Sequence, residues 1–205
     1  MAEEQFPEEQ NAATRGGKAR KEVFEWVKAL AIAAILVWLI RWFLFAPFAV
    51  DGPSMQPNFH TGERLIVNKI IFDIRQPHRG EVVVFHVPQE GRDFIKRVIA
   101  LPGDKVKVEG DDVFVNDVKQ DEPYLKQAIE EANKKGELWN QTGPNFPNEN
   151  VTEGTVPADS FLAMGDNRSN SEDSRRIGYI PYKQLIGRAD VIFWPPSDMK
   201  IIKHG

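Results

Sequence analysis

The amino-acid sequence predicts a mainly β fold: a single N-terminal transmembrane helix over residues 23–48, then an all-β domain with one small helix over residues 49–205. Two observations carry this prediction. Residues 29–50 form an almost unbroken apolar run, whereas every later apolar run is short and rich in β-branched residues. The first pattern is typical of a membrane span and the second of strands. A length of 205 residues suits one ordinary domain with an appendage.

Charge and composition exclude several classes of protein. The chain has 26 Lys and Arg against 30 Asp and Glu, a net charge of −4, which argues against nucleic-acid binding. It has no cysteine, which excludes a disulfide framework, a Cys-x-x-Cys metal or redox site and a cysteine nucleophile. Hydrophobic residues make up 41%, too many for a disordered chain. We expect neither a cofactor nor a metal site.

The apolar run has the length and composition of a membrane anchor. Only Arg41 and Pro47 interrupt it, and as a helix it would rise about 33 Å, enough to cross a hydrocarbon core. Aromatic residues crowd both ends, as interfacial side chains do, and Pro47 is expected to end the helix near Phe45. The alternatives are a buried helix of a soluble domain and a cleaved signal peptide, but the run is too long for a signal peptide and lacks a clear cleavage site.

The charges before the anchor predict its orientation. Residues 15–28 carry a net charge of +3, and the positive-inside rule assigns such a flank to the cytoplasm. Residues 1–22 are then expected to form a disordered cytoplasmic tail. The protein is expected in the cell membrane as a single-pass protein, with its β domain outside the cytoplasm.

The sequence after the anchor predicts strands separated by turns. Gly, Pro, Asn and Asp cluster between the apolar runs, and one segment, residues 123–136, has the pattern of a soluble helix. The expected strands cover residues 64–71, 81–87, 94–101, 105–108, 113–115 and 189–193.

Ser54 is the best-placed nucleophile among the six serines. It lies four residues past the apolar run, within about 14 Å of its end even in an extended chain. Gly52 gives the backbone room, and the apolar Met55 and Phe59 are expected to be exposed to the membrane interface. The alternative is an ordinary hydroxyl in a turn after the helix.

Lys96 is the matching candidate for a general base. Strand alternation places Lys96 and Arg97 on opposite faces of an apolar strand, so we expect one of them to be held among apolar neighbours. A buried lysine has a lowered pKa, and its neutral amine can take the proton of a serine hydroxyl. Arg97 stays charged and is expected to pair with a carboxylate. The alternatives are an exposed edge-strand lysine and a Ser-His-Asp triad, although no G-x-S-x-G signature supports a triad.

A third segment, residues 164–178, is densely polar and holds three of the six serines. Asp166 and Asp173 are expected to pair with Arg97, Arg168 or Arg175, and buried pairs of this kind fix loop geometry. A calcium loop is excluded here, because the glycine and glutamate that an EF-hand needs are replaced by Ser171 and Ile177.

With these segments in place, the chain resembles the type I signal peptidases, a family of membrane-bound serine–lysine proteases, in its short Gram-positive or cyanobacterial form. The resemblance covers about residues 21–196, including the anchor. Its motifs are Ser-Met-x-Pro at 54–57, Gly-Glu-Arg-Leu-Ile-Val-Asn-Lys at 62–69, Arg-Gly-Glu-Val-Val-Val-Phe at 79–85, Lys-Arg-Val-Ile-Ala-Leu-Pro-Gly-Asp at 96–104 and Gly-Asp-Asn-Arg-Ser-Asn-Ser-Glu-Asp-Ser-Arg at 165–175.

The resemblance implies a catalytic fold shared with LexA-type self-cleaving repressors, and a role for each matching residue. Ser54 would be the nucleophile, Lys96 the general base, and Ser171 the hydroxyl that orients the lysine amine. One position departs from the Gram-negative pattern: Gly52 stands where that branch has a serine in the oxyanion hole, so a backbone N–H must serve instead. The residues implied to brace the site by ion pairing are Arg97, Asp166, Asp173 and Arg175.

The activity implied is removal of N-terminal signal peptides from exported preproteins, by cleavage after a small-x-small site through an acyl-enzyme. The implied partners are these preproteins and the lipid bilayer, without nucleic acid, and the enzyme is expected to be a monomer. Two alternatives are a self-cleaving repressor relative and an inactive, membrane-tethered β module for binding or assembly.

Overall fold

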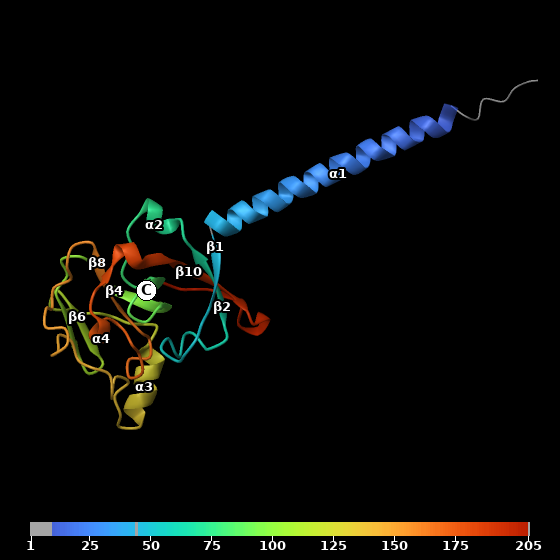
Figure 1. The fold of residues 1–205 in the computed structure, drawn as a ribbon. Helices are drawn as coiled ribbons and strands as arrows, with labels where there is room; N and C mark the ends of the chain where they lie inside the picture. The colour runs from blue at the N-terminus through green and yellow to red at the C-terminus, as the bar shows by residue number, and fades with distance from the viewer. Residues whose placement is uncertain (1–9, 44, 205) are drawn as a thin grey trace, which may run out of the picture. The chain divides into compact units, whose positions relative to one another are not determined.

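A computed structural model describes residues 10–43 and 45–204, and the chain divides into two compact units, Met1–Leu44 and Phe45–Gly205 (Figure 1). The first unit contains one helix, and the second contains the sheets. The elements are α1 Gln10–Phe43, β1 Phe45–Ala49, β2 Arg64–Asn68, α2 Ile71–Ile74, β3 Val82–Val87, β4 Arg92–Ala100, β5 Val106–Glu109, β6 Asp112–Val115, β7 Val118–Lys119, α3 Lys126–Lys134, β8 Ser160–Met164, α4 Ser174–Ile177, β9 Ile180–Pro181, η1 Tyr182–Gln184, β10 Leu185–Trp194, η2 Pro196–Asp198 and β11 Lys200–Ile201.

Helix α1 corrects the expectation of a disordered tail over residues 1–22. The helix begins at Gln10, and the stretch that follows is rich in Ala, Lys, Arg and Glu, which all have high helix propensity. The remainder of the expected tail, residues 1–9, lies outside the described residues. Among the described residues, no helix combines the length and apolarity needed to cross a membrane. The expected span also includes residues 39–45, whose side chains lie outside the described part.

The expected end of the helix at residue 48 is wrong. Helix α1 ends at Phe43, and Phe45–Ala49 forms strand β1, which pairs with β2 in antiparallel register. Pro47 lies opposite Ile66 on the outermost strand of the sheet, where its missing N–H removes no bond to a further strand. The boundary between the two units therefore falls four residues earlier than the sequence predicts.

The second unit is mainly β, as predicted. An eight-stranded sheet has the order β1-β2-β10-β3-β4-β8-β9, with β11 added to β10, and these neighbouring strands pair in antiparallel fashion. A smaller sheet has the order β5-β6-β7. Helix α3 is the small helix expected within residues 123–136 (Figure 1).

Strand β4 runs through the centre of this unit and is buried along most of its length. Its neighbours on either side are β3 and β8, and the register places Lys96 opposite Val83 and Arg97 opposite Met164. Ile95 and Val98 belong to two different apolar clusters, which shows that both faces of the strand are covered. A strand paired on both edges and covered on both faces holds its polar side chains in a rigid, dry setting.

Candidate active site

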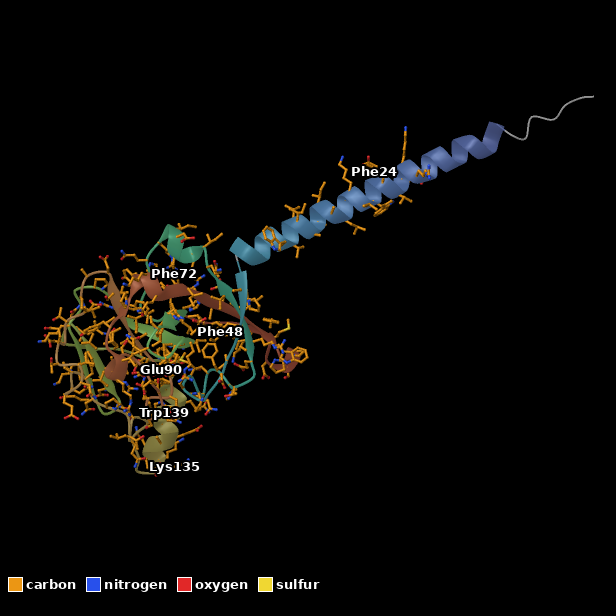
Figure 2. All side chains as sticks on the ribbon, in the orientation of Figure 1. Phe24, Phe48, Phe72, Glu90, Lys135 and Trp139 are labelled. Carbon is orange, nitrogen blue, oxygen red and sulfur yellow. The ribbon has the colours of Figure 1, made fainter. Side chains whose placement is uncertain are left out.

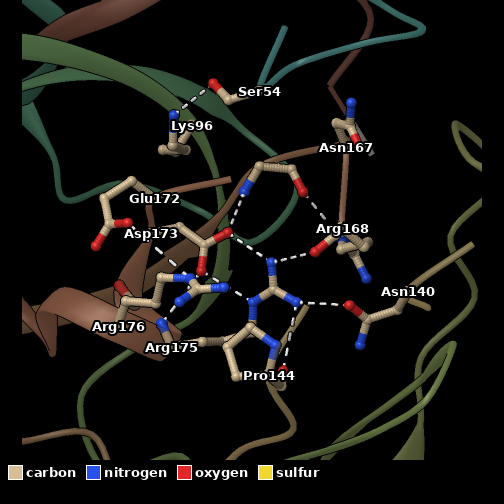
Figure 3. Close-up of polar contacts among 12 residues, drawn as sticks. Ser54, Lys96, Asn140, Pro144, Asn167, Arg168, Glu172, Asp173, Arg175 and Arg176 are labelled. Atoms are coloured by element: carbon tan, nitrogen blue, oxygen red, sulfur yellow. Dashed lines mark hydrogen bonds and ion pairs between the residues drawn. The ribbon is translucent and has the colours of Figure 1, made fainter. Parts of the chain in front are cut away.

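Ser54 and Lys96 lie in contact, although 42 residues separate them in the sequence. The Lys96 Nζ donates a hydrogen bond to Ser54 Oγ at 2.7 Å and another to the carbonyl of Ile95 at 3.0 Å (Figure 3). Ser54 belongs to the turn after β1, and Lys96 comes from the middle of β4. Three strands stand between β1 and β4 in the sheet order, so it is the turn after β1 that carries Ser54 to Lys96.

Burial gives Lys96 the properties of a base. The residue is only 3% exposed, and its Nζ lies 4.9 Å from the centre of the Phe94 ring. Burial lowers the pKa of Lys96 to about 8, although the Asp173 carboxylate acts in the opposite direction. A substantial fraction of this amine is therefore neutral in mildly alkaline solution, and a neutral amine can accept a proton from a serine hydroxyl.

The pair lies at the wall of a cleft of about 480 Å³. One side of this cleft comes from the end of β1 and the turn after it, and the other side comes from the first half of β4. Phe48 and Phe94 contribute apolar surface, and Asn170 and Glu172 contribute polar groups at the far wall. This shape suits an extended peptide with its carbonyl carbon beside Ser54 Oγ.

Arg97 is buried together with Lys96, whereas the sequence predicted burial for only one of the two. The Arg97 side chain makes two hydrogen bonds to Asp166, at 2.9 and 2.7 Å, and a third to the carbonyl of Gly80. Asp166 also accepts a hydrogen bond from Asn58 Nδ2 at 2.8 Å. These contacts join β4, the loop after β8 and the turn that carries Ser54.

Asp173 and Arg175 form a second ion pair, fully buried, in the same loop. Asp173 also accepts a hydrogen bond from the backbone N–H of Gly165 and caps α4. Burial alone would raise the pKa of Asp173, but the hydrogen bonds and charge of Arg175 lower it, so the carboxylate stays ionised. Arg175 in turn donates to Arg168 O and Asn140 Oδ1 and thereby fixes the loop (Figure 3).

Ser171 lacks the hydrogen bond to Lys96 that the resemblance implied for it. Its hydroxyl is buried and helps to lower the pKa of Asp173, but within the described residues it makes no hydrogen bond of normal geometry, either to Lys96 or to any other group. The Ile95 carbonyl takes the second hydrogen bond of the Lys96 amine instead. The structure therefore does not show the hydrogen bond that was expected between Ser171 and Lys96.

Two glycines shape the backbone around Ser54. A Cβ on Gly165 would lie 2.4 Å from the Ser54 carbonyl oxygen and 2.2 Å from Ser171 Oγ, so only glycine fits there. Gly52 has φ +88° and open space around it, which allows the tight turn before Ser54. Met55 and Phe59, expected at the surface, are buried at 0% and 2% exposure because the turn folds them into the core.

Sequence reasoning missed Glu122 and Tyr124, which precede α3. The Tyr124 ring stacks on the Arg97 guanidinium at 3.8 Å, and the Glu122 carboxylate forms a buried ion pair with Arg168. Arg168 was expected to pair with Asp166 or Asp173. The sequence signal for Glu122 and Tyr124 is weak: an acidic and an aromatic residue in an irregular stretch, without periodicity.

No histidine serves this site in the part of the chain whose side chains are described. His86 pairs with Asp93 at an exposed position, and His204 lies beside Asp190. None of the four histidines forms a hydrogen bond with Ser54. In the same part of the chain, no group of three or more acidic or histidine side chains could hold a metal ion.

A serine hydroxyl held against a desolvated lysine amine, beside a peptide-sized cleft, is the arrangement of a serine–lysine hydrolase. Comparison with known proteins shows the family to which the chain belongs. The family model of signal peptidases, peptidase S26, matches residues 23–194, so this chain belongs to the signal peptidase S26 family and is a peptide-bond hydrolase.

Individual relatives agree over nearly their whole length. Signal peptidase IB of Staphylococcus aureus (strain COL) is 37% identical over 183 residues, which cover 88% of this chain and 94% of the relative. Signal peptidase I S of Bacillus subtilis (strain 168) is 40% identical over 186 residues, with the same coverage. A solved structure of a signal peptidase I from Enterococcus faecalis V583 is 30% identical, with a TM-score of 0.49. The match covers 56% of this chain and 97% of the solved chain.

Proposed function

We propose that this chain removes signal peptides from exported preproteins by cleaving after a small-x-small site, with Ser54 as nucleophile and Lys96 as general base. The family supports the reaction class, and the 2.7 Å contact between Lys96 Nζ and Ser54 Oγ carries the assignment of residues. The cleft between β1 and β4 supports an extended substrate in that position.

The chemistry proceeds in two balanced halves. Ser54 Oγ attacks the scissile carbonyl carbon while the neutral Lys96 amine takes its proton. The tetrahedral intermediate then breaks its C–N bond, and the Lys96 ammonium returns that proton to the leaving amine, which leaves an ester on Ser54. Water next attacks the ester while Lys96 takes its proton. The ester C–O bond then breaks, the Lys96 ammonium returns that proton to Ser54 Oγ, and the carboxylic acid leaves.

The oxyanion of this intermediate needs donors, and the backbone supplies a candidate. Gly52 offers no hydroxyl, but within the described residues the Ser54 N–H makes no hydrogen bond and is free for a ligand. Loss of one oxyanion donor typically lowers the rate by about 10²–10³-fold. The turn shape set by Gly52 and Pro53 orients this donor.

The apolar part of α1, residues 29–43, supports a membrane anchor in this proposal, with the N-terminus in the cytoplasm and the catalytic unit outside it. Anchoring keeps Ser54 near the bilayer, where the apolar core of a signal peptide already lies. Restricting both reactants to one surface supplies part of the rate as proximity. A monomer suffices, because Ser54, Lys96 and both ion pairs come from one chain.

The test is a cleavage assay with a preprotein that carries an Ala-x-Ala site, using the full chain in detergent. Wild type and Ser197→Ala, a change at an exposed serine in η2, are expected to release the mature protein with its N-terminus directly after the last alanine. Ser54→Ala is expected to lose at least about 10³-fold in rate. Equal cleavage by Ser54→Ala would refute the nucleophile. Absence of cleavage by folded wild type, with lipid supplied, would favour the inactive tethered module.

A further inference from the structure

A second groove, of about 670 Å³, lies beside the catalytic cleft on the face that carries α3. We name it the α3 groove. Figure 2 shows Trp139 and Lys135, which line it, well away from Phe48, which lines the cleft. Its walls are mixed: amides and charged groups alternate with apolar surface. The residues that matter here are Pro57, Asn58, Gln127, Glu131, Trp139 and Asn167.

Asn167 lines the α3 groove and contacts Ser54, which lines the catalytic cleft. The backbone N–H of Asn167 donates to the Ser54 carbonyl at 3.0 Å, and its side chain donates to the Pro53 carbonyl at 3.2 Å. Asn167 and Ser169 face the α3 groove, while Asn170 of the same loop faces the catalytic cleft. A peptide that leaves Ser54 over Asn167 would pass into the α3 groove, because Asn167 lines that groove.

The floor of the α3 groove is built from residues that also hold the active-site loop. Tyr124 lines the groove and stacks on Arg97. Trp139 lines the groove, and its Nε1 donates to the Asp166 carbonyl at 2.9 Å. A ligand in the groove would therefore contact Tyr124 and Trp139, which themselves contact the two members of the Arg97–Asp166 ion pair.

The catalytic cleft does not accommodate the segment of the substrate that follows the cleaved bond. The cleft lies along the end of β1, the strand that continues directly from the apolar N-terminal segment, and this is where the signal-peptide side of the substrate belongs if the proposed function holds. The chain after the cleaved bond must leave on the other side of Ser54. The α3 groove is the hollow that adjoins this exit.

We propose that the α3 groove binds the first residues of the mature protein, those after the cleaved bond, as an extended peptide; this inference rests on the proposed function. The exposed amide of Gln127 can pair with peptide backbone, and the apolar surface of Leu138 and Trp139 can cover side chains. Glu131 and Glu137 outnumber Lys135 among the charged groups, so the groove favours a mature segment that carries Lys or Arg.

The test compares two substrates that share one signal peptide and one Ala-x-Ala site. The short substrate ends one residue after the cleaved bond, and the long substrate continues for eight residues that include two lysines. Each is assayed with the full chain in detergent, as wild type, Gln127→Trp, Glu131→Lys and Glu130→Lys. Glu130 is the matched control, because it is an exposed glutamate of α3 that does not line the groove.

Wild type is expected to cleave the long substrate with a kcat/KM about tenfold higher than the short one. Gln127→Trp is expected to remove this advantage by filling the groove. Glu131→Lys is expected to reduce it about threefold, in line with one partly exposed charge contact. Glu130→Lys is expected to leave it unchanged, and all four proteins are expected to cleave the short substrate equally.

Two outcomes would overturn this inference while leaving the proposed function intact: equal kcat/KM for both substrates in wild type, or equal losses on both substrates in Gln127→Trp. The second outcome would show that the substitution acts on the active site and not on a groove that binds the mature segment. Failure of wild type to cleave even the short substrate would overturn the proposed function itself.

Discussion

Arg97 and Asp166 face each other as a buried ion pair with two parallel hydrogen bonds, and Arg97 is the residue directly after Lys96 in β4. Asp166 lies two residues past β8, and it also accepts from Asn58 in the turn of Ser54. The pair therefore fixes the strand of the proposed base relative to the turn of the proposed nucleophile. Its value is geometric, because buried pairs add little net stability but are costly to break.

Asp166→Asn is expected to lower the free energy of unfolding by about 3–5 kcal/mol, because Arg97 would remain buried with its charge unmatched. Cleavage is expected to fall as well, since the Asn58 contact loosens. Thermal and urea unfolding of the purified chain measure the first effect. The control is Asp112→Asn, which breaks an exposed pair with Lys119 and is expected to cost less than about 1 kcal/mol. Equal losses for the two variants would contradict the structural role of Asp166.

Gly165→Ala is expected to lower kcat by about 10²-fold or more. The new methyl group would press on the Ser54 carbonyl oxygen, which is backbone and cannot rotate away, so the turn must shift. The control is Gly103→Ala, at a glycine with φ +83° and open space, where the strain costs about 1 kcal/mol of stability and leaves turnover unchanged. Steady-state cleavage assays at one pH compare the two. Full activity in Gly165→Ala would show that the turn is not as closely packed as described.

Lys96→Met is expected to stabilise the fold near neutral pH while abolishing cleavage. The pKa of Lys96 is about 8 in the folded state and about 10.5 when exposed, so the unfolded chain binds more protons between these values and wild-type stability rises with pH there. Below about pH 8 the buried charge of Lys96 lowers the stability of wild type by about 3 kcal/mol, and Lys96→Met removes this cost. The substitution also removes the hydrogen bonds of Lys96, which contribute about 1 kcal/mol each.

The net gain from Lys96→Met is therefore about 1–2 kcal/mol at pH 7 and becomes a loss of about 1–2 kcal/mol by about pH 10.5, as urea unfolding at both pH values would measure. Lys107→Met, at an exposed lysine in β5, serves as the control and is expected to show no such dependence. A gain of equal size at both pH values would contradict a lowered pKa.

Tyr124→Phe and Tyr124→Leu are expected to separate the two contacts of this residue. Phenylalanine keeps the ring on Arg97 and loses the hydroxyl contacts with Glu122 and Arg168, of which the first contributes about 1 kcal/mol. Leucine also loses the cation–π contact, which contributes about 2 kcal/mol in a desolvated site. We expect thermal stability and cleavage in the order wild type, Phe, Leu. A phenylalanine variant as impaired as the leucine variant would show that the ring contact is unimportant.

Much of the β unit was predictable, because alternation and turn residues are local signals. Strands β2, β3, β4, β5, β6 and β10 all fall where β-branched runs were found, within a few residues at each end. Strand β8 was missed: Ser160–Met164 contains no β-branched residue and is buried throughout, so it shows no alternation. Strand β1 was hidden inside an apolar run, since pairing with β2 depends on residues far along the chain.

The candidate site was predictable in its residues but not in its geometry. Ser54, Lys96, Arg97 and Asp166 were chosen from residue type, local pattern and resemblance, and the structure brings them together. The expected hydrogen bond between Ser171 and Lys96 is not found. Such a bond depends on the rotamer of a hydroxyl group and on the path of a loop, and neither produces a pattern in the local sequence. Glu122 and Tyr124 were missed for the same reason: their partners are set by tertiary packing alone.

The most direct measurement is the rate at which Ser54 is acylated, as a function of pH. Wild type is mixed with a preprotein substrate in a single turnover, quenched in acid at successive times from pH 6 to pH 10, and the adduct is located by peptide mass spectrometry. We predict an ester on Ser54 whose formation quickens about tenfold per pH unit below about pH 8 and levels off above it, and no adduct in Lys96→Met. An adduct on another residue, or a rate that does not change with pH, would contradict a Ser54 nucleophile activated by a neutral Lys96.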